Sequence, residues 1–251
     1  MIKLREFVGK NLVSYLREGD FAHAGEEEAI RLVMQGSLKY SGQKILDVGC
    51  GLGGTADFIQ SEGWGIVTGI DIEEKSILYA KEHYPDVLFH NIDVLDVDRF
   101  FLHKNFDLIC CFNSFYAFSD QEKALSALHS ISHNKTQLII FDYSIKSKFG
   151  KNKFYREDSR LQGPFKPVIT DNIEERLNSC GWGLKNIVDI STNYIRWYKD
   201  LVTKLKENKQ QIISKFSQSA YLKAHSTYSN LYAGLLNQDL GGTIVYSEKM
   251  R

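Results

Sequence analysis

A turn with the glycine spacing GxGxxG lies between an apolar run and a helix-like stretch, and its glycines are Gly49, Gly51 and Gly54. Glycine lacks a Cβ, so it accepts positive φ and lets the backbone approach a ligand closely. A turn of this kind, between a strand and the first turn of a helix, is typical of nucleotide sites. The spacing alone fits an NAD(P)-linked oxidoreductase as well as other nucleoside-binding enzymes, so neighbouring residues must distinguish them.

Three aspartates follow successive apolar runs and could bind such a nucleoside. Asp47 stands two residues before the first glycine, where a carboxylate suits a cationic sulfonium and an α-amino group better than a pyrophosphate. Asp71 ends the next run, where it can accept both hydroxyls of a ribose, as carboxylates in NAD sites also do. Asp93 follows the third run, where it can reach an adenine amino group. Together the three carboxylates predict a site for a positively charged sulfur nucleoside.

The elements that must position these residues follow from the hydrophobic pattern. Short apolar runs predict strands at 44–48, 66–70, 87–89, 106–111, 137–141, 182–190 and 243–246. Helical spacing predicts helices at 5–18, 26–39, 54–62, 73–83, 120–132, 171–180, 193–216 and 219–236. Strands that alternate with helices predict parallel βαβ units, whose carboxyl ends share one edge of an open sheet.

The length of 251 residues fits one domain that spans 1–251. Within it we expect a helical cap at 1–40, a cofactor-binding half at 41–143, and a substrate-side insert with the C-terminal strands at 144–251. The segment 144–170 lacks periodicity and holds two of the three prolines, so it is predicted to be an ordered insert or lid.

The combined pattern of the glycine turn, Asp71, Asp93 and the run Phe106–Ile109 resembles class I methyltransferases that use S-adenosylmethionine. The resemblance implies a Rossmann-like α/β fold with seven mostly parallel strands, helices on both faces and an antiparallel last strand. It implies that Gly49 and Gly51 lie against the methionine portion, Asp71 at the ribose, and Asp93 with Val94 at the adenine. The residues expected at the cofactor are Tyr15, Gly49, Cys50, Gly51, Asp71, Ile72, Asp93, Val94 and Phe112.

The chain is similar, more narrowly, to phosphoethanolamine and sarcosine/dimethylglycine N-methyltransferases. The resemblance implies that Tyr15 covers the cofactor and that Tyr143 holds the substrate head group. Two features depart from the phosphoethanolamine enzymes, because Ala117 stands where they carry a catalytic histidine, and Pro164 with Lys166 does not reproduce their phosphate-binding residues. These departures argue against phosphoethanolamine as the acceptor.

Methyl transfer requires alignment of donor and acceptor and, for some acceptors, removal of a proton. His23 is the candidate base because it lies in a glycine-bounded turn predicted to sit above the glycine loop, and Tyr143 is the second candidate catalytic residue. Asn113, Tyr116 and Tyr143 are predicted to bind the acceptor. We expect a small molecule with an amine nitrogen, with oxygen or carbon acceptors as the alternative and an NAD(P)-linked oxidoreductase as a more distant one.

Composition restricts the partners further. Lys plus Arg equals Asp plus Glu at 31 each, which argues against nucleic acid or an anionic membrane as a partner. The sequence Asn113–Tyr116 superficially resembles the NPPY motif of adenine methyltransferases but lacks both prolines. The four cysteines form no CxxC pair, which argues against a zinc site, and no run is long enough to cross a membrane. We expect a cytoplasmic protein, and monomer and homodimer both stay open.

Overall fold

The computed structural model describes residues 5–102, 105–146, 154–155 and 164–250. Eight strands form one sheet in it, and in chain order they are β1 (Lys44–Val48), β2 (Ile66–Asp71), β3 (Leu88–Asn91), β4 (Phe106–Phe112), β5 (Ser132–Ile145), β6 (Val168–Ile169), β7 (Trp182–Asp189) and β8 (Gly241–Lys249). The order across the sheet is β3-β2-β1-β4-β5-β8-β7, and the short β6 pairs with β5.

The sheet is parallel except at β8, which runs antiparallel to both β5 and β7. The predicted α/β fold with an antiparallel last strand is therefore confirmed. The chain passes from β1 to β2 and β3 on one side and then returns to β4 on the other side of β1. In such a sheet a ligand binds where the order reverses, at the carboxyl ends of the strands. The reversal here lies between β1 and β4.

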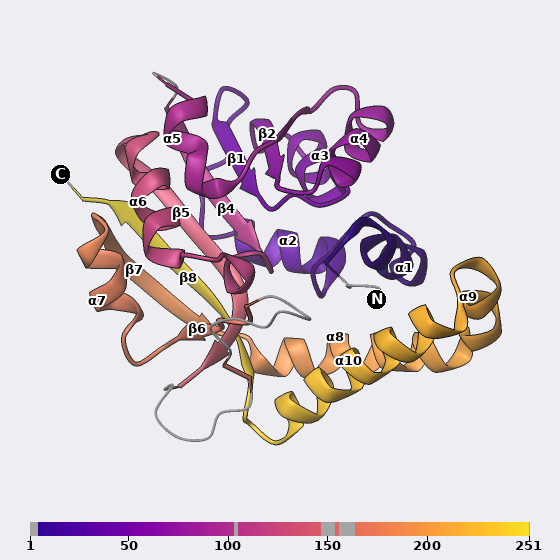
Figure 1. Ribbon diagram of the computed structural model, residues 1–251. Coiled ribbons are helices and arrows are strands. Elements are labelled where there is room, and N and C mark those ends of the chain that lie inside the picture. Colours follow the sequence, from indigo (N-terminus) through magenta and orange to yellow (C-terminus); the bar gives the residue numbers. More distant parts are fainter. Residues whose placement is uncertain (1–4, 103–104, 147–153, 156–163, 251) are drawn as a thin grey trace.

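Ten helices are described, and in chain order they are α1 (Phe7–Arg17), α2 (Glu26–Met34), α3 (Gly54–Ser61), α4 (Glu74–His83), α5 (Val97–Phe100), α6 (Gln121–Ser130), α7 (Ile173–Ser179), α8 (Ser191–Glu207), α9 (Lys209–Lys215) and α10 (Gln218–Leu236). Helices α2, α3 and α4 pack on one face of the sheet, and α5, α6 and α7 pack on the other (Figure 1). Among these described helices, none is both long and apolar enough to cross a bilayer.

Strand β4 shows why the apolar runs are continuous. Its residues Leu108 and Cys110 face the core on the α2 side, whereas Ile109 and Cys111 face the core on the α6 side. Because both faces of a parallel sheet are covered by helices, successive side chains from Leu108 to Phe112 are all buried and apolar, and only Asp107 near the start of the strand is charged. This burial explains why β4 could be predicted from its sequence to within a residue.

Helices α8, α9 and α10 form a helical arm beside the sheet, and α1 packs on this arm (Figure 1). Leu12 and Leu16 of α1 share a buried cluster with Leu201 and Leu205 of α8. The single helix predicted at 193–216 is divided at Asn208, and this part of the prediction was wrong. The Asn208 side chain donates a hydrogen bond to the carbonyl of Lys204, 2.9 Å away, so it satisfies the last turn of α8 and ends that helix.

The predicted insert at 144–170 lies partly outside the described residues. Within them, β5 continues to Ile145, and Val168 and Ile169 form the additional strand β6 beside it. The first half of β5 is irregular, because Ser132 pairs with Phe106 and the next pairing is Gln137 with Leu108. This irregularity explains why the sequence predicted only the regular part of the strand.

Candidate active site

The glycine turn follows β1 directly and is built on left-handed backbone. Gly49, Gly51 and Gly53 have φ values of 80°, 57° and 95°, in a region that side chains with a Cβ rarely adopt. The amides of Gly49 and Cys50 both donate to the carbonyl of Ile70 in β2, at 2.7 and 2.9 Å. The turn is therefore fastened to the neighbouring strand.

Two glycines of the turn serve different purposes. A Cβ on Gly49 would lie 2.5 Å from the Cβ of Ser114, whose hydroxyl donates to the carbonyl of Val48. Gly49 thus allows β1 and the segment after β4 to approach closely. A Cβ on Gly51 would meet only ordinary contacts, with Ala22 at 3.6 Å and Lys10 at 3.8 Å. The neighbours of Gly51 therefore leave room for a Cβ, whereas those of Gly49 do not.

Asp71, at the end of β2, is buried and accepts three hydrogen bonds. The amide of Gly51 donates to Oδ2 and the amide of Glu73 donates to Oδ1, each at 2.9 Å. The ammonium of Lys10, from α1, also lies 2.9 Å from Oδ2. These bonds fix the carboxylate at the glycine turn, where the sequence predicted it. Lys10 had no local signal in the sequence, because 61 residues separate it from Asp71.

Asp47 lies in β1 one strand away, and its side chain is only 1% exposed. Its Oδ2 atom has no hydrogen-bond partner among the described residues. Burial, and to a smaller extent the charge of Asp71, raises the pKa of Asp47 to about 7. A buried carboxylate without a partner favours a cation that can neutralise it. This orphaned oxygen therefore fits the amino group or sulfonium of S-adenosylmethionine.

We expect the affinity for S-adenosylmethionine to depend on pH through Asp47. A cation requires the ionised carboxylate, so below about pH 7 binding must first displace a proton from Asp47. The affinity should fall about tenfold per pH unit well below this pKa. Isothermal titration from pH 5.5 to 7.5, in buffers of different ionisation enthalpy, should detect the released proton. Asp47→Asn should bind more weakly and lose this slope; an unchanged slope would refute the assignment to Asp47.

The predicted adenine end lies beyond β3. Asp93 accepts a hydrogen bond from the amide of Leu95 at 3.0 Å, so this carboxylate also caps the following turn. A hollow of about 390 Å³ lies there, lined by Asn91, Ile92, Asp93, Asp96, Arg99 and Phe100. Val94 is buried and Ile72 is 69% exposed, and neither is among the residues that line this hollow. The hollow therefore joins Asp93 to apolar side chains of Ile92 and Phe100, a combination that suits a flat base with a polar edge.

The predicted acceptor residues Asn113, Tyr116 and Tyr143 meet around Asp142. The amides of Tyr116 and Tyr143 donate to this carboxyl group at 2.9 and 2.7 Å, and the Asn113 side chain donates at 3.3 Å. Asp142 is fully buried, and burial raises its pKa to about 7 in spite of these bonds. The sequence predicted Tyr143 but missed its neighbour Asp142.

Tyrosines from α8 complete this group. The Tyr143 and Tyr198 hydroxyls form a hydrogen bond with each other. The Asn113 side chain donates to the Tyr194 hydroxyl at 2.9 Å. Tyr194 and Tyr198 lie on the buried face of α8, as their helical spacing with Leu201 and Leu205 indicates. Their hydroxyls nevertheless contact the acceptor residues, which periodicity could not reveal.

His23 is buried, with its ring centroid 5.1 Å from that of Phe112 and 5.9 Å from that of Phe141. Its Nδ1 lies 3.1 Å from the carbonyl of Ala24 and its Nε2 lies 3.0 Å from the Thr55 hydroxyl. The carbonyl can only accept, so Nδ1 carries the proton and Nε2 accepts from Thr55. Burial lowers the pKa of His23 to about 3, so the ring is neutral at physiological pH.

The remaining predicted cofactor residues lie in different surroundings. Phe112 ends β4 and packs on His23, and Cys50 is buried in the glycine turn, where desolvation raises its pKa. The ring of Tyr15 packs instead against Phe216, with centroids 6.1 Å apart, and the Lys215 ammonium lies 4.5 Å from its centre. The structure thus places Tyr15 toward α9, and its role as a cofactor cover stays a prediction.

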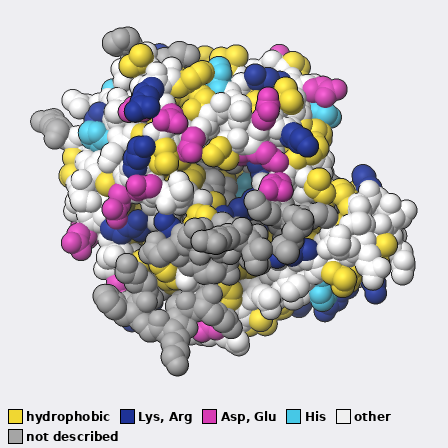
Figure 2. All heavy atoms as spheres, viewed as in Figure 1, with side chains coloured by type: hydrophobic (Ala, Val, Ile, Leu, Met, Phe, Trp, Pro, Cys, Tyr) yellow, Lys and Arg dark blue, Asp and Glu magenta, His cyan; other side chains and the backbone are white. Residues whose placement is uncertain are grey.

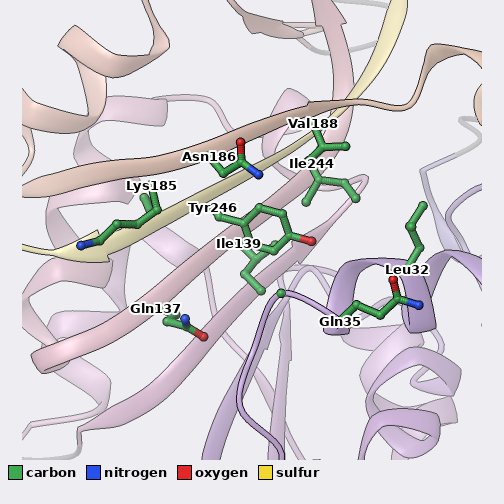
Figure 3. A pocket seen from close by; sticks show the side chains of 11 residues that line it. Leu32, Gln35, Gln137, Ile139, Lys185, Asn186, Val188, Ile244 and Tyr246 are labelled. Atoms are coloured by element: carbon green, nitrogen blue, oxygen red, sulfur yellow. The ribbon is translucent and has the colours of Figure 1, made fainter.

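A second hollow, of about 440 Å³, lies between α2 and the sheet face of β5, β7 and β8 (Figure 3). Leu32, Ile139, Val188, Ile244 and Tyr246 are among its lining residues. None of the predicted site residues lines it, so this hollow is separate from the candidate active site.

Acidic and basic side chains are interspersed on the face of the molecule that Figure 2 shows. A single-sign patch of the kind that binds nucleic acid does not dominate the described residues of that face. This distribution agrees with a small molecule as the partner.

Comparison with known families adds independent information. Residues 39–232 match a family model described as a methyltransferase domain. The chain is 24% identical over 236 residues to the phosphoethanolamine N-methyltransferase of Plasmodium falciparum, which covers 91% of this chain and 84% of that protein. It is also 32% identical over 103 residues to a protein of Invertebrate iridescent virus 6 described as a methyltransferase. This second match covers 41% of the chain and 36% of the viral protein.

Among solved structures, a phosphoethanolamine N-methyltransferase of Haemonchus contortus, in complex with phosphomonomethylethanolamine and S-adenosylhomocysteine, superposes with a TM-score of 0.81. The sequences are 16% identical, and the match covers 100% of this chain and 61% of that chain. At this identity the likeness concerns the fold.

Proposed function

Because the chain belongs to the methyltransferase-domain family, we propose that it transfers a methyl group from S-adenosylmethionine to the amine nitrogen of a small molecule. The family membership confirms the predicted enzyme class, a methyltransferase that depends on S-adenosylmethionine, and removes the oxidoreductase alternative. The identity of the acceptor atom is our proposal, and it rests on the buried carboxyl group of Asp142.

The residues that would hold the cofactor are those of the glycine turn and the strand ends. The orphaned Oδ2 of Asp47 would pair with a cationic group, Asp71 would accept the ribose hydroxyls, and Asp93 would face the adenine. When bound, S-adenosylmethionine supplies a methyl group on a positively charged sulfur. The turn at Gly51 would lie against the bound nucleoside without a side chain in the way.

Asp142 favours a nitrogen acceptor on electrostatic grounds. Methylation of a neutral amine leaves a positive charge on the nitrogen, whereas methylation of an alkoxide or a carbanion leaves a neutral product. The oxygens of the Asp142 carboxyl group accept hydrogen bonds from Asn113, Tyr116 and Tyr143. The partial negative charge of these oxygens therefore lies among the predicted acceptor residues. Fixed dipoles and aromatic faces that meet a developing cation lower the barrier to its formation.

His23 and Tyr143 are the proposed catalytic residues. Tyr143 presents a hydroxyl held by Tyr198, and burial keeps that hydroxyl protonated because it raises the pKa of Tyr143 well above its usual value. It would therefore act as a donor that orients the acceptor. His23 would accept a proton only if Nε2 released Thr55, so its neutral ring favours a positioning role beside Phe112.

The proposal is tested by a radiolabelled-methyl assay with ethanolamine, phosphoethanolamine, sarcosine, dimethylglycine, a catechol and a quinone precursor. We expect transfer to nitrogen, with kcat/KM about 10- to 100-fold lower in Tyr143→Phe because one oriented hydrogen bond is lost. Tyr246→Phe, which removes a hydroxyl that bonds to Val33 elsewhere, is the matched control and should be unaffected. Transfer to oxygen or carbon alone would overturn the nitrogen assignment.

His23 is examined in the same assay with His23→Asn. If His23 only positions neighbouring groups, the variant loses activity equally at every pH between 6 and 8, because the wild-type ring does not titrate there. A loss that is large at pH 8 and disappears toward pH 6 would instead indicate that His23 acts as a base that is protonated at low pH.

A further inference from the structure

Arg17, the last residue of α1, is a buried cation with unmet hydrogen-bonding capacity. Its side chain is 3% exposed, and its Nε lies 3.3 Å from Oε1 of Glu26. Nevertheless Nε and Nη1 are both buried without a hydrogen bond among the described residues. Desolvating a guanidinium costs several kcal/mol unless its donors find acceptors. Beyond the ion pair with Glu26, these donors need an acceptor that the described part of the chain does not provide.

The packing of α1 places Arg17 next to the acceptor residues. Leu16, which precedes it, shares a buried cluster with Leu201 of α8, and Tyr228 of α10 packs on the same cluster. Tyr198 lies one turn before Leu201 on α8, and its ring is 6.2 Å from that of Tyr228. Arg17 therefore lies where α1, α8 and α10 meet the acceptor residues.

The electrostatics agree with this placement. The positive charge of Arg17 acts to lower the pKa of Tyr194, Tyr198 and Tyr228, although burial outweighs it and raises all three. Their hydroxyl groups therefore stay protonated and can donate hydrogen bonds at neutral pH. A guanidinium beside several hydroxyl donors is a suitable environment for an anion.

We propose that Arg17 and these tyrosine hydroxyls bind an acidic group, a carboxylate or a phosphate, on the methyl acceptor. The inference rests on the proposed function, and it narrows the acceptor to an amine that also carries an acid. Asp142 and Arg17 then select opposite ends of the acceptor, the nitrogen at Asp142 and the acidic group at Arg17. The cation that recognises the acid comes from the first helix of the chain, whereas the segment of Pro164 and Lys166 does not supply it.

The test compares Arg17→Gln and Arg17→Lys with the wild type on the amine panel. For acid-bearing amines we expect Arg17→Gln to lower kcat/KM about 100-fold, chiefly through KM, and Arg17→Lys to recover part of the loss. The ratio of sarcosine to phosphoethanolamine turnover distinguishes carboxylate from phosphate. S-adenosylmethionine affinity should change less than twofold. Arg31→Gln, at an arginine of α2 whose side chain is 50% exposed, is the matched control.

A structural role for Arg17 makes a different prediction. If its pair with Glu26 mainly stabilised the fold, both Arg17→Gln and Glu26→Gln would lower Tm, and neutral and acidic amines would lose activity equally. This result, or faster turnover of ethanolamine than of every acid-bearing amine, would overturn the proposal. We expect instead that Glu26→Gln leaves acidic acceptors at least as well bound, because it removes a competing anion.

Binding of simple anions separates the two proposals. Acetate and inorganic phosphate should raise Tm of the wild type loaded with S-adenosylhomocysteine, and Arg17→Gln should abolish the rise. Anion binding without transfer to any amine would refute the amine acceptor and leave the Arg17 site standing. Methyl transfer to an amine, with no effect of anions on Tm and no dependence on Arg17, would refute the Arg17 site and leave the amine acceptor standing.

Discussion

Replacing Asp71 by asparagine is expected to weaken the binding of S-adenosylmethionine about 100-fold, because the ribose hydroxyls lose a charged acceptor and each such hydrogen bond contributes about 1.5–3 kcal/mol. The substitution keeps the shape of the side chain, so the effect reports on charge and hydrogen bonding. Isothermal titration at constant pH measures it directly.

Two controls separate cofactor binding from structural support. Asp98→Asn alters an exposed acid on α5 and should leave the affinity unchanged. Lys10→Met removes the ammonium that lies 2.9 Å from Asp71 in the free protein. If Asp71 served only to hold α1 through Lys10, both Lys10→Met and Asp71→Asn would weaken the cofactor equally. We expect Lys10→Met to have a much smaller effect.

The second large effect concerns Gly49. Gly49→Ala is expected to lower the free energy of unfolding by about 2–4 kcal/mol, because alanine is strained at a φ of 80° and its Cβ would lie 2.5 Å from Ser114. For a chain of this size that corresponds to a fall in Tm of roughly 5–10 °C. Thermal unfolding followed by circular dichroism measures the shift.

Gly51 and Gly42 provide the comparison. Gly51→Ala should reduce Tm less, since a φ of 57° strains alanine but its Cβ meets no contact shorter than 3.6 Å, and it should impair cofactor binding because we propose that this turn lies against the nucleoside. Gly42→Ala lies on an exposed turn with its nearest neighbour at 3.9 Å and should change neither property. Equal losses of Tm in Gly49→Ala and Gly51→Ala would contradict the different purposes of these two glycines.

The strands and the order of elements could be predicted because their signals are local. Strand β4 is apolar from Leu108 to Phe112, since it is buried on both faces there, and Gly49, Gly51 and Gly53 mark the turn where φ is positive. The irregular first half of β5 was missed because its polar residues, from His133 to Thr136, give no alternating pattern.

The parts of the site that could not be predicted depend on contacts between distant segments. Lys10 and Arg17 belong to an amphipathic helix, where lysine and arginine ordinarily face water. Only the packing of α1 on α8 buries Arg17, and only the position of α1 beside β2 brings Lys10 to Asp71. Hydrophobic periodicity indicates which face of a helix is buried, but it does not identify the polar group that the helix end meets.

The attachment of α1 to the glycine turn also has a kinetic consequence. Lys10 bonds to Asp71 and lies beside Gly51, and the amide of Phe7 donates to Glu73, so the helix covers the proposed position of the ribose. If Asp71 binds the ribose as proposed, the nucleoside can reach it only after the bond from Lys10 breaks. The rate at which this helix detaches would then set an upper limit on turnover, whatever the speed of the methyl transfer itself.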